Sequence, residues 1–131
     1  MLKSNKTHIF YDEKTDYLEI IMRKCETVAE DIGNGIFELK TTRGKTVGYS
    51  IMEAFSRIDE LTFLDPFLKF SAMVKMSRLK RKLTQEQMAK RMGIGLLPYQ
   101  RLESGDNNPT LKTILKLKKV LPEVSMDQIA S

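Results

Sequence analysis

Residues 84–105 read TQEQMAKRMGIGLLPYQRLESG, and the first part of this stretch predicts a short helix. Thr84 is a good N-cap. Gln87 stands three residues later, where its side chain can hydrogen-bond back to the backbone N–H of the cap. Met88 and Met92 then keep one apolar face at helical spacing. A helix is therefore expected to start directly after Thr84.

The second part of the stretch predicts a tight turn and another short helix. Gly93 and Gly95 interrupt the helical spacing of the apolar residues. A helix is then expected over residues 97–104, because Pro98 suits a first turn, where no N–H is needed, and Gly105 suits a helix end. Two short helices joined by a turn containing glycine form a helix-turn-helix, whose second helix fits the major groove of DNA.

Residues 83–105 resemble the DNA-binding core of the phage-repressor (Xre-type) helix-turn-helix family and match its spacing without a gap. The same or similar residues are Thr84, Gln85, Ala89, Gly93, Ile94, Leu102, Glu103 and Gly105. The resemblance implies a sequence-specific DNA-binding transcriptional repressor. It also implies that Gln85 contacts phosphate and braces the recognition helix, that Arg78 and Glu103 form a structural ion pair, and that Tyr99 is buried.

Charge is distributed unevenly along the 131 residues, which suffice for one ordinary domain or two small ones. Residues 1–65 carry nine Lys and Arg against twelve Asp and Glu, a net charge of −3. Residues 66–131 carry thirteen against five, a net charge of +8. This asymmetry favours a second half that meets phosphate and a first half that does not.

The first half alternates apolar and polar residues in short runs, as antiparallel strands do. Strands are expected at residues 8–11, 17–22, 27–32, 36–41 and 47–51. The segments FYDEKTDYLEI and GKTVGYSIMEAF resemble a small bacterial module with a Tyr-Asp-x-x-x-Asp-x-Leu start and a strand-ending Val-Gly-x-x-Ile. Proteins of that type are often encoded beside toxin genes. The resemblance, which covers about 45 residues, implies the antitoxin of a toxin–antitoxin pair.

We predict an α+β protein of two domains. Residues 1–64 are expected to form a small antiparallel β-sheet with one helix near residues 52–61 and to bind protein. Residues 65–131 are expected to form an all-α, five-helix, lambda-repressor-like domain with helices at 67–82, at the two helices of the motif, at 111–120 and at 126–130. In the helix that Thr110 caps, the residues expected in the core are Leu111, Ile114, Leu115 and Leu117.

The chain offers little for catalysis. It has one His, one Cys and no phosphate-cradling glycine loop, so no enzymatic activity and no cofactor are expected. A turn with solvated charges is favoured over a metal site for Asp12, Glu13 and Asp16. A single cysteine, Cys25, excludes an intrachain disulfide and a cysteine-based zinc site, and it is expected in a strand, half-buried.

A cytoplasmic location is expected. No apolar run approaches ~18 residues, which would be needed to span a membrane, and the first residues lack the apolar core of a signal peptide.

The candidate DNA-binding residues lie on or beside the helix-turn-helix. They are Lys82, Thr84, Gln85, Leu96, Leu97, Gln100, Arg101, Ser104 and Lys112. Further cations expected along the DNA backbone are Lys75, Lys80, Lys90 and Arg91. Phosphate contact is assigned to Gln85, Lys82 and Lys112. Gln100 is the best candidate for reading a base, because its amide can pair with N6 and N7 of adenine.

Leu96, Leu97 and Pro98 occupy positions where the resembling family usually has polar base-readers. Leucine cannot read hydrogen-bonding groups, but it can touch a thymine methyl. An exposed leucine pair can equally mark a protein interface. Two hypotheses follow: a homodimeric repressor that binds double-stranded DNA and a cognate toxin, or a protein-interaction module whose helix-turn-helix no longer reads DNA.

Overall fold

The computed structural model describes residues 6–105 and 108–124. The chain divides into two compact units, Met1–Ile58 and Asp59–Ser131. The first unit contains a β-sheet, and the second contains the α-helices. The expected domain boundary, after residue 64, lies slightly further along the chain than this division.

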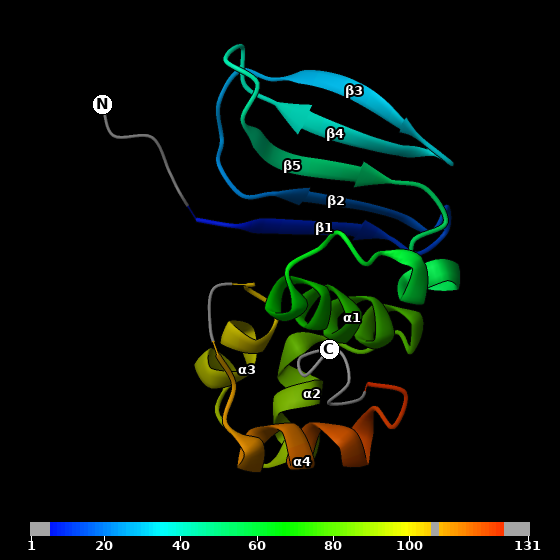
Figure 1. The fold of residues 1–131 in the computed structure, drawn as a ribbon. Coiled ribbons are helices and arrows are strands. Elements are labelled where there is room, and N and C mark those ends of the chain that lie inside the picture. The colour runs from blue at the N-terminus through cyan, green and yellow to red at the C-terminus, as the bar shows by residue number, and fades with distance from the viewer. Residues whose placement is uncertain (1–5, 106–107, 125–131) are drawn as a thin grey trace. The chain divides into compact units, whose positions relative to one another are not determined.

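The first unit is a five-stranded antiparallel sheet, in agreement with the strands that alternation predicts (Figure 1). The strands are β1 (His8–Asp12), β2 (Tyr17–Ile21), β3 (Val28–Gly33), β4 (Ile36–Lys40) and β5 (Thr46–Ile51). Their order across the sheet is β1-β2-β5-β4-β3. The fifth strand in the chain thus inserts between the second and the fourth, and β3 is left at an edge.

One face of β1, β2 and β5 carries the apolar core of the sheet. Ile9 lies opposite Ile20 and Leu18 lies opposite Ile51, so their side chains share a face. Leu18, Ile20 and Ile51 have no exposed surface. β3 differs, because all six of its residues are exposed.

Asp16 fastens the turn between β1 and β2. Its carboxylate accepts hydrogen bonds from the Tyr11 hydroxyl (2.6 Å), from Phe55 N (2.9 Å) and from Ser56 Oγ (2.7 Å) and N (3.3 Å). Burial acts to raise the pKa of Asp16, but these donors outweigh it and lower the pKa below its usual value. The second Asp of the Tyr-Asp-x-x-x-Asp-x-Leu pattern therefore has a structural role.

The segment after β5 is a 3-10 helix, η1 (Phe55–Glu60), rather than the longer helix expected at residues 52–61. Its backbone leaves the helical region at Arg57, where φ is −130°. The Arg57 guanidinium donates to the Met52 carbonyl oxygen through Nη2 (2.6 Å) and Nε (3.2 Å). This segment contains the division between the two units.

Four α-helices lie among the described residues of the second unit. They are α1 (Pro66–Lys80), α2 (Gln85–Met92), α3 (Leu96–Leu102) and α4 (Leu111–Val120). Asp65 caps α1, and Pro66 occupies its first turn. The fifth expected helix, at residues 126–130, lies outside the described residues, so the five-helix domain stays a prediction. Within the described part of the chain, no helix is long and apolar enough to cross a bilayer.

The apolar stripe of α4 is narrower than the sequence predicted. Ile114 and Leu117 are buried, as expected. Leu111 and Leu115 are 56% and 52% exposed, so their assignment to the core was wrong. The helical spacing identifies an apolar side but not how wide a face the neighbouring helix covers.

Cys25 is half-buried as expected, but it lies in the connection between β2 and β3 rather than in a strand.

Candidate nucleic-acid interface

The start of α2 is held by the reciprocal hydrogen bonds that the sequence predicts. Thr84 Oγ1 accepts from Gln87 N (3.1 Å), and Gln87 Oε1 accepts from Thr84 N (2.8 Å). This capping box satisfies two backbone donors at the helix start. The Thr84 side chain, a candidate for DNA contact, is therefore also the N-cap of the helix.

A three-residue turn, Gly93 to Gly95, joins α2 to α3. Gly93 adopts the left-handed conformation (φ +70°), which glycine tolerates without strain. The Ile94 backbone N–H donates to the Ala89 carbonyl oxygen (3.0 Å). α3 begins at Leu96, with Pro98 in its first turn. The two helices and the turn thus have the lengths of a helix-turn-helix.

Arg78 of α1 and Glu103, the residue after α3, form a buried ion pair. Arg78 Nε lies 2.6 Å from Glu103 Oε2, and Arg78 Nη2 donates to Glu103 Oε1 (3.0 Å). The residues are only 7% and 5% exposed. Burial disfavours the charged guanidinium, but the Glu103 carboxylate outweighs this and raises the pKa of Arg78. Arg78 Nη1 also donates to the Leu83 carbonyl oxygen (2.8 Å), just before α2.

The Glu103 carboxylate also accepts hydrogen bonds from α2 and α3. Gln85 Nε2, in the first turn of α2, donates to Glu103 Oε1 (3.0 Å). The hydroxyl of Tyr99 donates to Glu103 Oε2. Tyr99 is fully buried, and burial together with the adjacent carboxylate raises its pKa. Glu103 therefore joins three helices through one carboxylate.

Gln85 also forms a hydrogen bond with a residue of α3. Its Oε1 accepts a hydrogen bond from Nε2 of Gln100 (3.1 Å). Gln100 is exposed, and one N–H and its Oε1 are not used in that bond. These are the two groups that a bidentate contact with adenine needs. The chain of contacts Arg78–Glu103–Gln85–Gln100 thus runs from the buried ion pair to an exposed amide on α3.

Leu96 and Leu97 are exposed at the start of α3, 38% and 59% respectively. Leu96 borders a hollow of about 440 Å³. The other residues that line the hollow are Thr84, Glu86, Gln87, Ala89, Lys90 and Ile94. Their exposure makes the two leucines accessible to thymine methyl groups or to another protein.

The remaining candidates differ in how exposed they are. Lys82 is exposed in the link between α1 and α2, where it adopts a positive φ of 59°. Arg101 and Lys112 are exposed on α3 and α4. Ser104 is half-buried, and its hydroxyl donates to the Arg101 carbonyl oxygen (2.8 Å). Ser104 therefore has its hydroxyl proton engaged within the protein.

Lys75 of α1, one of the cations expected along the DNA backbone, is less available than the sequence suggested. Lys75 is half-buried, and burial lowers the pKa of its ammonium, although the nearby Glu103 charge opposes this. Arg81 pairs with Glu123 through two contacts, Nη1–Oε2 (2.7 Å) and Nη2–Oε1 (2.9 Å). Arg81 therefore joins the end of α1 to the segment after α4.

Sequence reasoning did not predict the Gln85–Gln100 bond, the Tyr99 hydroxyl contact or the Arg81–Glu123 pair. The Gln85–Gln100 and Arg81–Glu123 contacts join different helices or segments, which the spacing within one helix cannot predict. Tyr99 and Glu103 are four residues apart, so helical spacing puts them on one side but does not show that the hydroxyl meets the carboxylate. The only available signal was the polarity of Gln100 and Gln85 within the motif.

Comparison with known proteins identifies the helical unit. Residues 74–129 match the family described as Helix-turn-helix. An uncharacterized HTH-type transcriptional regulator, YqaE, of Bacillus subtilis (strain 168) is 37% identical over 60 residues, which cover 46% of this chain and 51% of the relative. The cryptic phage CTXphi transcriptional repressor RstR of Vibrio cholerae is 41% identical over 46 residues, covering 35% and 40%.

The matched segments thus span about half the length of YqaE, and less of RstR. No solved structure matches the chain. The match at residues 74–129 agrees with the resemblance seen in residues 83–105 and with the helix–turn–helix geometry of α2 and α3. Residues 74–129 are therefore a helix-turn-helix domain of the Xre type.

Proposed function

We propose that the chain is a DNA-binding transcriptional repressor that reads its site through α3. The observation that carries this proposal is the contact chain Arg78–Glu103–Gln85–Gln100, which ends in an exposed amide on the second helix of a helix-turn-helix. The names of the two relatives, a transcriptional regulator and a transcriptional repressor, support the same function. The proposed role is binding rather than catalysis, in the cytoplasm with the DNA.

The residues divide into those that position the protein and those that read sequence. Lys82 and Lys112 are exposed beside the motif and contact phosphates, which fixes the register of the protein on the duplex. Gln85 contacts phosphate and also holds Gln100. Gln100 pairs with adenine in the major groove, and Arg101 and the leucine pair lie beside it on the same short helix.

The functional species is a homodimer. One recognition helix covers only a half-site, and proteins of this kind gain affinity and specificity by binding two half-sites about one helical turn apart.

We further propose that the chain is an antitoxin that represses its own operon and binds a cognate toxin through the sheet unit. The support is the resemblance of the first half and the exposed edge strand β3, in which Val28 is 61% and Ile32 is 45% exposed. An open strand edge with apolar side chains can accept a strand from a partner. The product of the adjacent gene is the partner to test.

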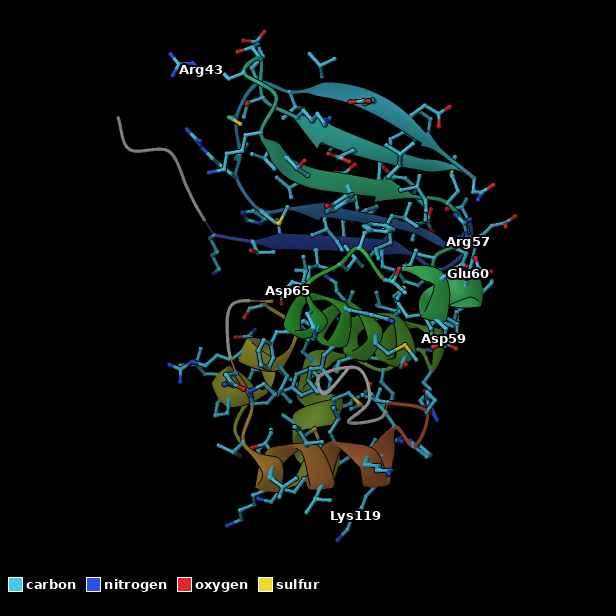
Figure 2. All side chains as sticks on the ribbon, viewed as in Figure 1. Arg43, Arg57, Asp59, Glu60, Asp65 and Lys119 are labelled. Atoms are coloured by element: carbon cyan, nitrogen blue, oxygen red, sulfur yellow. The ribbon has the colours of Figure 1, made fainter. Side chains whose placement is uncertain are left out.

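The acidic excess of residues 1–65 lies outside the sheet unit and so says nothing about the partner of that unit. Asp59, Glu60 and Asp65, labelled in Figure 2, supply the acidic excess of residues 1–65, and all three belong to the second unit. Residues 1–58 carry nine Lys and Arg against nine Asp and Glu, so the sheet unit has no net charge. Partner binding is therefore proposed from the resemblance of the first half and the exposed edge strand β3, without a charge argument.

A test uses fluorescence anisotropy of the full chain on two duplexes, one from the region upstream of its own gene and one with the same bases scrambled. The expected result is salt-dependent binding that favours the upstream duplex. Gln100→Ala should reduce this preference. Co-expression with the adjacent gene product should give a complex that Val28→Glu/Ile32→Glu disrupts without loss of DNA binding.

The alternative function is a protein-interaction module that no longer reads DNA. The exposure of Leu96 and Leu97 at the start of the recognition helix favours it. Absence of salt-dependent binding to either duplex would establish this alternative. Loss of partner binding in Leu96→Ser/Leu97→Ser would then identify the surface.

A further inference from the structure

Two loops meet at one end of the sheet, far along the chain from the helix-turn-helix. One loop, residues 22–27, joins β2 to β3, and the other, residues 41–45, joins β4 to β5. Because the strand order is β2-β5-β4-β3, the first loop must cross the ends of β5 and β4, beside the second loop. The hydrogen bond from Met22 N to the Val47 carbonyl oxygen (2.8 Å) continues the β2–β5 pairing and holds the start of the first loop against β5, just after the second loop.

Three hydrogen bonds close the β4–β5 loop on itself. Thr41 N donates to the Lys45 carbonyl oxygen (2.8 Å), Gly44 N donates to the Thr41 carbonyl oxygen (2.9 Å), and Lys45 N donates to Thr41 Oγ1 (3.1 Å). Gly44 has a φ of +88°, which other residues rarely adopt. The loop therefore presents its side chains from a fixed backbone.

A hollow of about 540 Å³ lies between the two loops. The residues that line it are Arg23, Cys25, Glu26, Thr41, Thr42, Arg43 and Lys45. Arg43 extends outward from the end of the sheet (Figure 2). The hollow thus combines guanidinium, ammonium and hydroxyl donors from two segments of the chain that both line it.

The charges of these loops are unbalanced within a unit that is neutral as a whole. The two loops carry four cations, Arg23, Lys24, Arg43 and Lys45, and a single acid, Glu26, and no ion pair joins these cations to a carboxylate among the described residues. Elsewhere in the same unit Lys40 pairs with Glu30 (Nζ–Oε2 2.7 Å). The loops therefore hold a local positive charge whose donors lack acidic partners.

We propose that these two loops bind backbone phosphates of duplex DNA, as a second contact surface outside the helix-turn-helix. Guanidinium groups match phosphate oxygens through paired hydrogen bonds, and the lysine adds charge. Contacts to phosphate carry no sequence information, so this surface adds affinity rather than specificity. The inference rests on the proposed DNA binding of the chain only for its choice of duplex DNA as the phosphate source.

The test compares two single substitutions of exposed cations in the full chain. Arg43→Gln removes a charge from the loops, and Lys14→Gln removes one from the turn between β1 and β2, at the other end of the sheet. Anisotropy is measured on a scrambled duplex over a salt series. Each phosphate contact contributes ~0.9 to the slope of log K against log salt. Arg43→Gln should therefore flatten the slope by about one unit, and Lys14→Gln should leave it unchanged.

The variant Arg23→Gln/Arg43→Gln/Lys45→Gln should flatten the slope by roughly two to three units and weaken the upstream and scrambled duplexes by the same factor. Circular dichroism melts check that each variant stays folded. Unchanged slopes for Arg43→Gln and the triple variant, or equal effects of Arg43→Gln and Lys14→Gln, would overturn the inference, as would a wild type that binds no duplex.

These outcomes separate the inference from the proposed regulator. If the triple variant loses affinity but the wild type shows no preference for the upstream duplex, the loops bind phosphate and the sequence-specific function is wrong. If the preference is present and the slopes do not change, the regulator stands and the loop surface does not.

Discussion

In each unit one carboxylate accepts several hydrogen bonds, but the two carboxylates differ in burial and in ion pairing. Glu103 is buried, pairs with Arg78 and accepts hydrogen bonds from three helices. Asp16 is half-exposed, forms no ion pair with any of the described residues, and accepts hydrogen bonds from Tyr11, Phe55 and Ser56. The same chemical group thus fastens one unit by a desolvated charge pair and the other by neutral donors. The free energies at stake should differ accordingly.

The largest effect is expected at Glu103. Glu103→Ala leaves the Arg78 guanidinium buried without a counter-charge, which should lower the free energy of unfolding by about 3–5 kcal/mol. Thermal and urea denaturation of the full chain would measure this. Arg78→Met/Glu103→Leu is the control, because removing both charges should cost less than the sum of the single changes. An unchanged melting temperature for Glu103→Ala would refute a stabilising pair.

A smaller effect is expected at Asp16. Asp16→Ala removes the acceptor for the Tyr11 hydroxyl and the Phe55 N–H, and the loss should be about 1–2 kcal/mol, since the group is partly solvated. If Asp16→Ala lowers the free energy of unfolding as much as Glu103→Ala does, the proposed difference between the two carboxylates is wrong.

The charge of Asp16 adds a pH dependence with a definite sign. Its pKa is lowered in the folded protein, so its stabilising contribution is present above its usual pKa, near pH 4, and is lost as the pH falls through the lowered value. Asp16→Asn should therefore lower the melting temperature at pH 7, and the gap from wild type should narrow below about pH 4. A gap that does not depend on pH would mean that the charge contributes nothing.

Some of these structural features could be predicted from the sequence, and others could not. The capping box of Thr84 and Gln87, the turn at Gly93 and the alternating strands are local, so spacing alone predicted them. The Arg78–Glu103 pair was implied by the family resemblance, not by spacing. The Gln85–Gln100 bond joins two helices, and no local pattern encodes the angle at which they meet.

The errors have physical causes as well. Leu111 and Leu115 lie beside the buried stripe of α4, and apolar spacing does not reveal where the neighbouring helix stops covering it. The net charge of −3 counted over residues 1–65 comes from Asp59, Glu60 and Asp65, so a count over half of the chain does not describe the sheet unit. The positive charge of the two sheet loops was not predicted either, because the charges of residues 1–58 sum to zero.

The next effect is expected at Gln100 and at Gln85, which joins Gln100 to Glu103. Gln100→Ala should remove discrimination worth ~1–3 kcal/mol between the upstream and scrambled duplexes while nonspecific binding stays nearly intact. Gln85→Ala should lose part of the same discrimination, because Gln100 then lacks its partner, and should also weaken both duplexes through a lost phosphate contact. If Gln85→Ala weakens both duplexes alike, its bond to Gln100 does not position the base-reader.

The smallest effect is expected at Lys82, which is exposed and lies outside both carboxylate clusters. Because a phosphate contact acts through counterion release, Lys82→Ala should flatten the salt slope by about one unit on every duplex and leave discrimination unchanged. The positive φ of Lys82 complicates an alanine change, since a β-carbon is strained there in any residue but glycine, so Lys82→Gly serves as the second variant. It should show the same slope as Lys82→Ala with a higher melting temperature. A slope that stays at the wild-type value in both variants would remove Lys82 from the interface and leave Gln85, Lys112 and the sheet loops as the remaining proposed phosphate contacts.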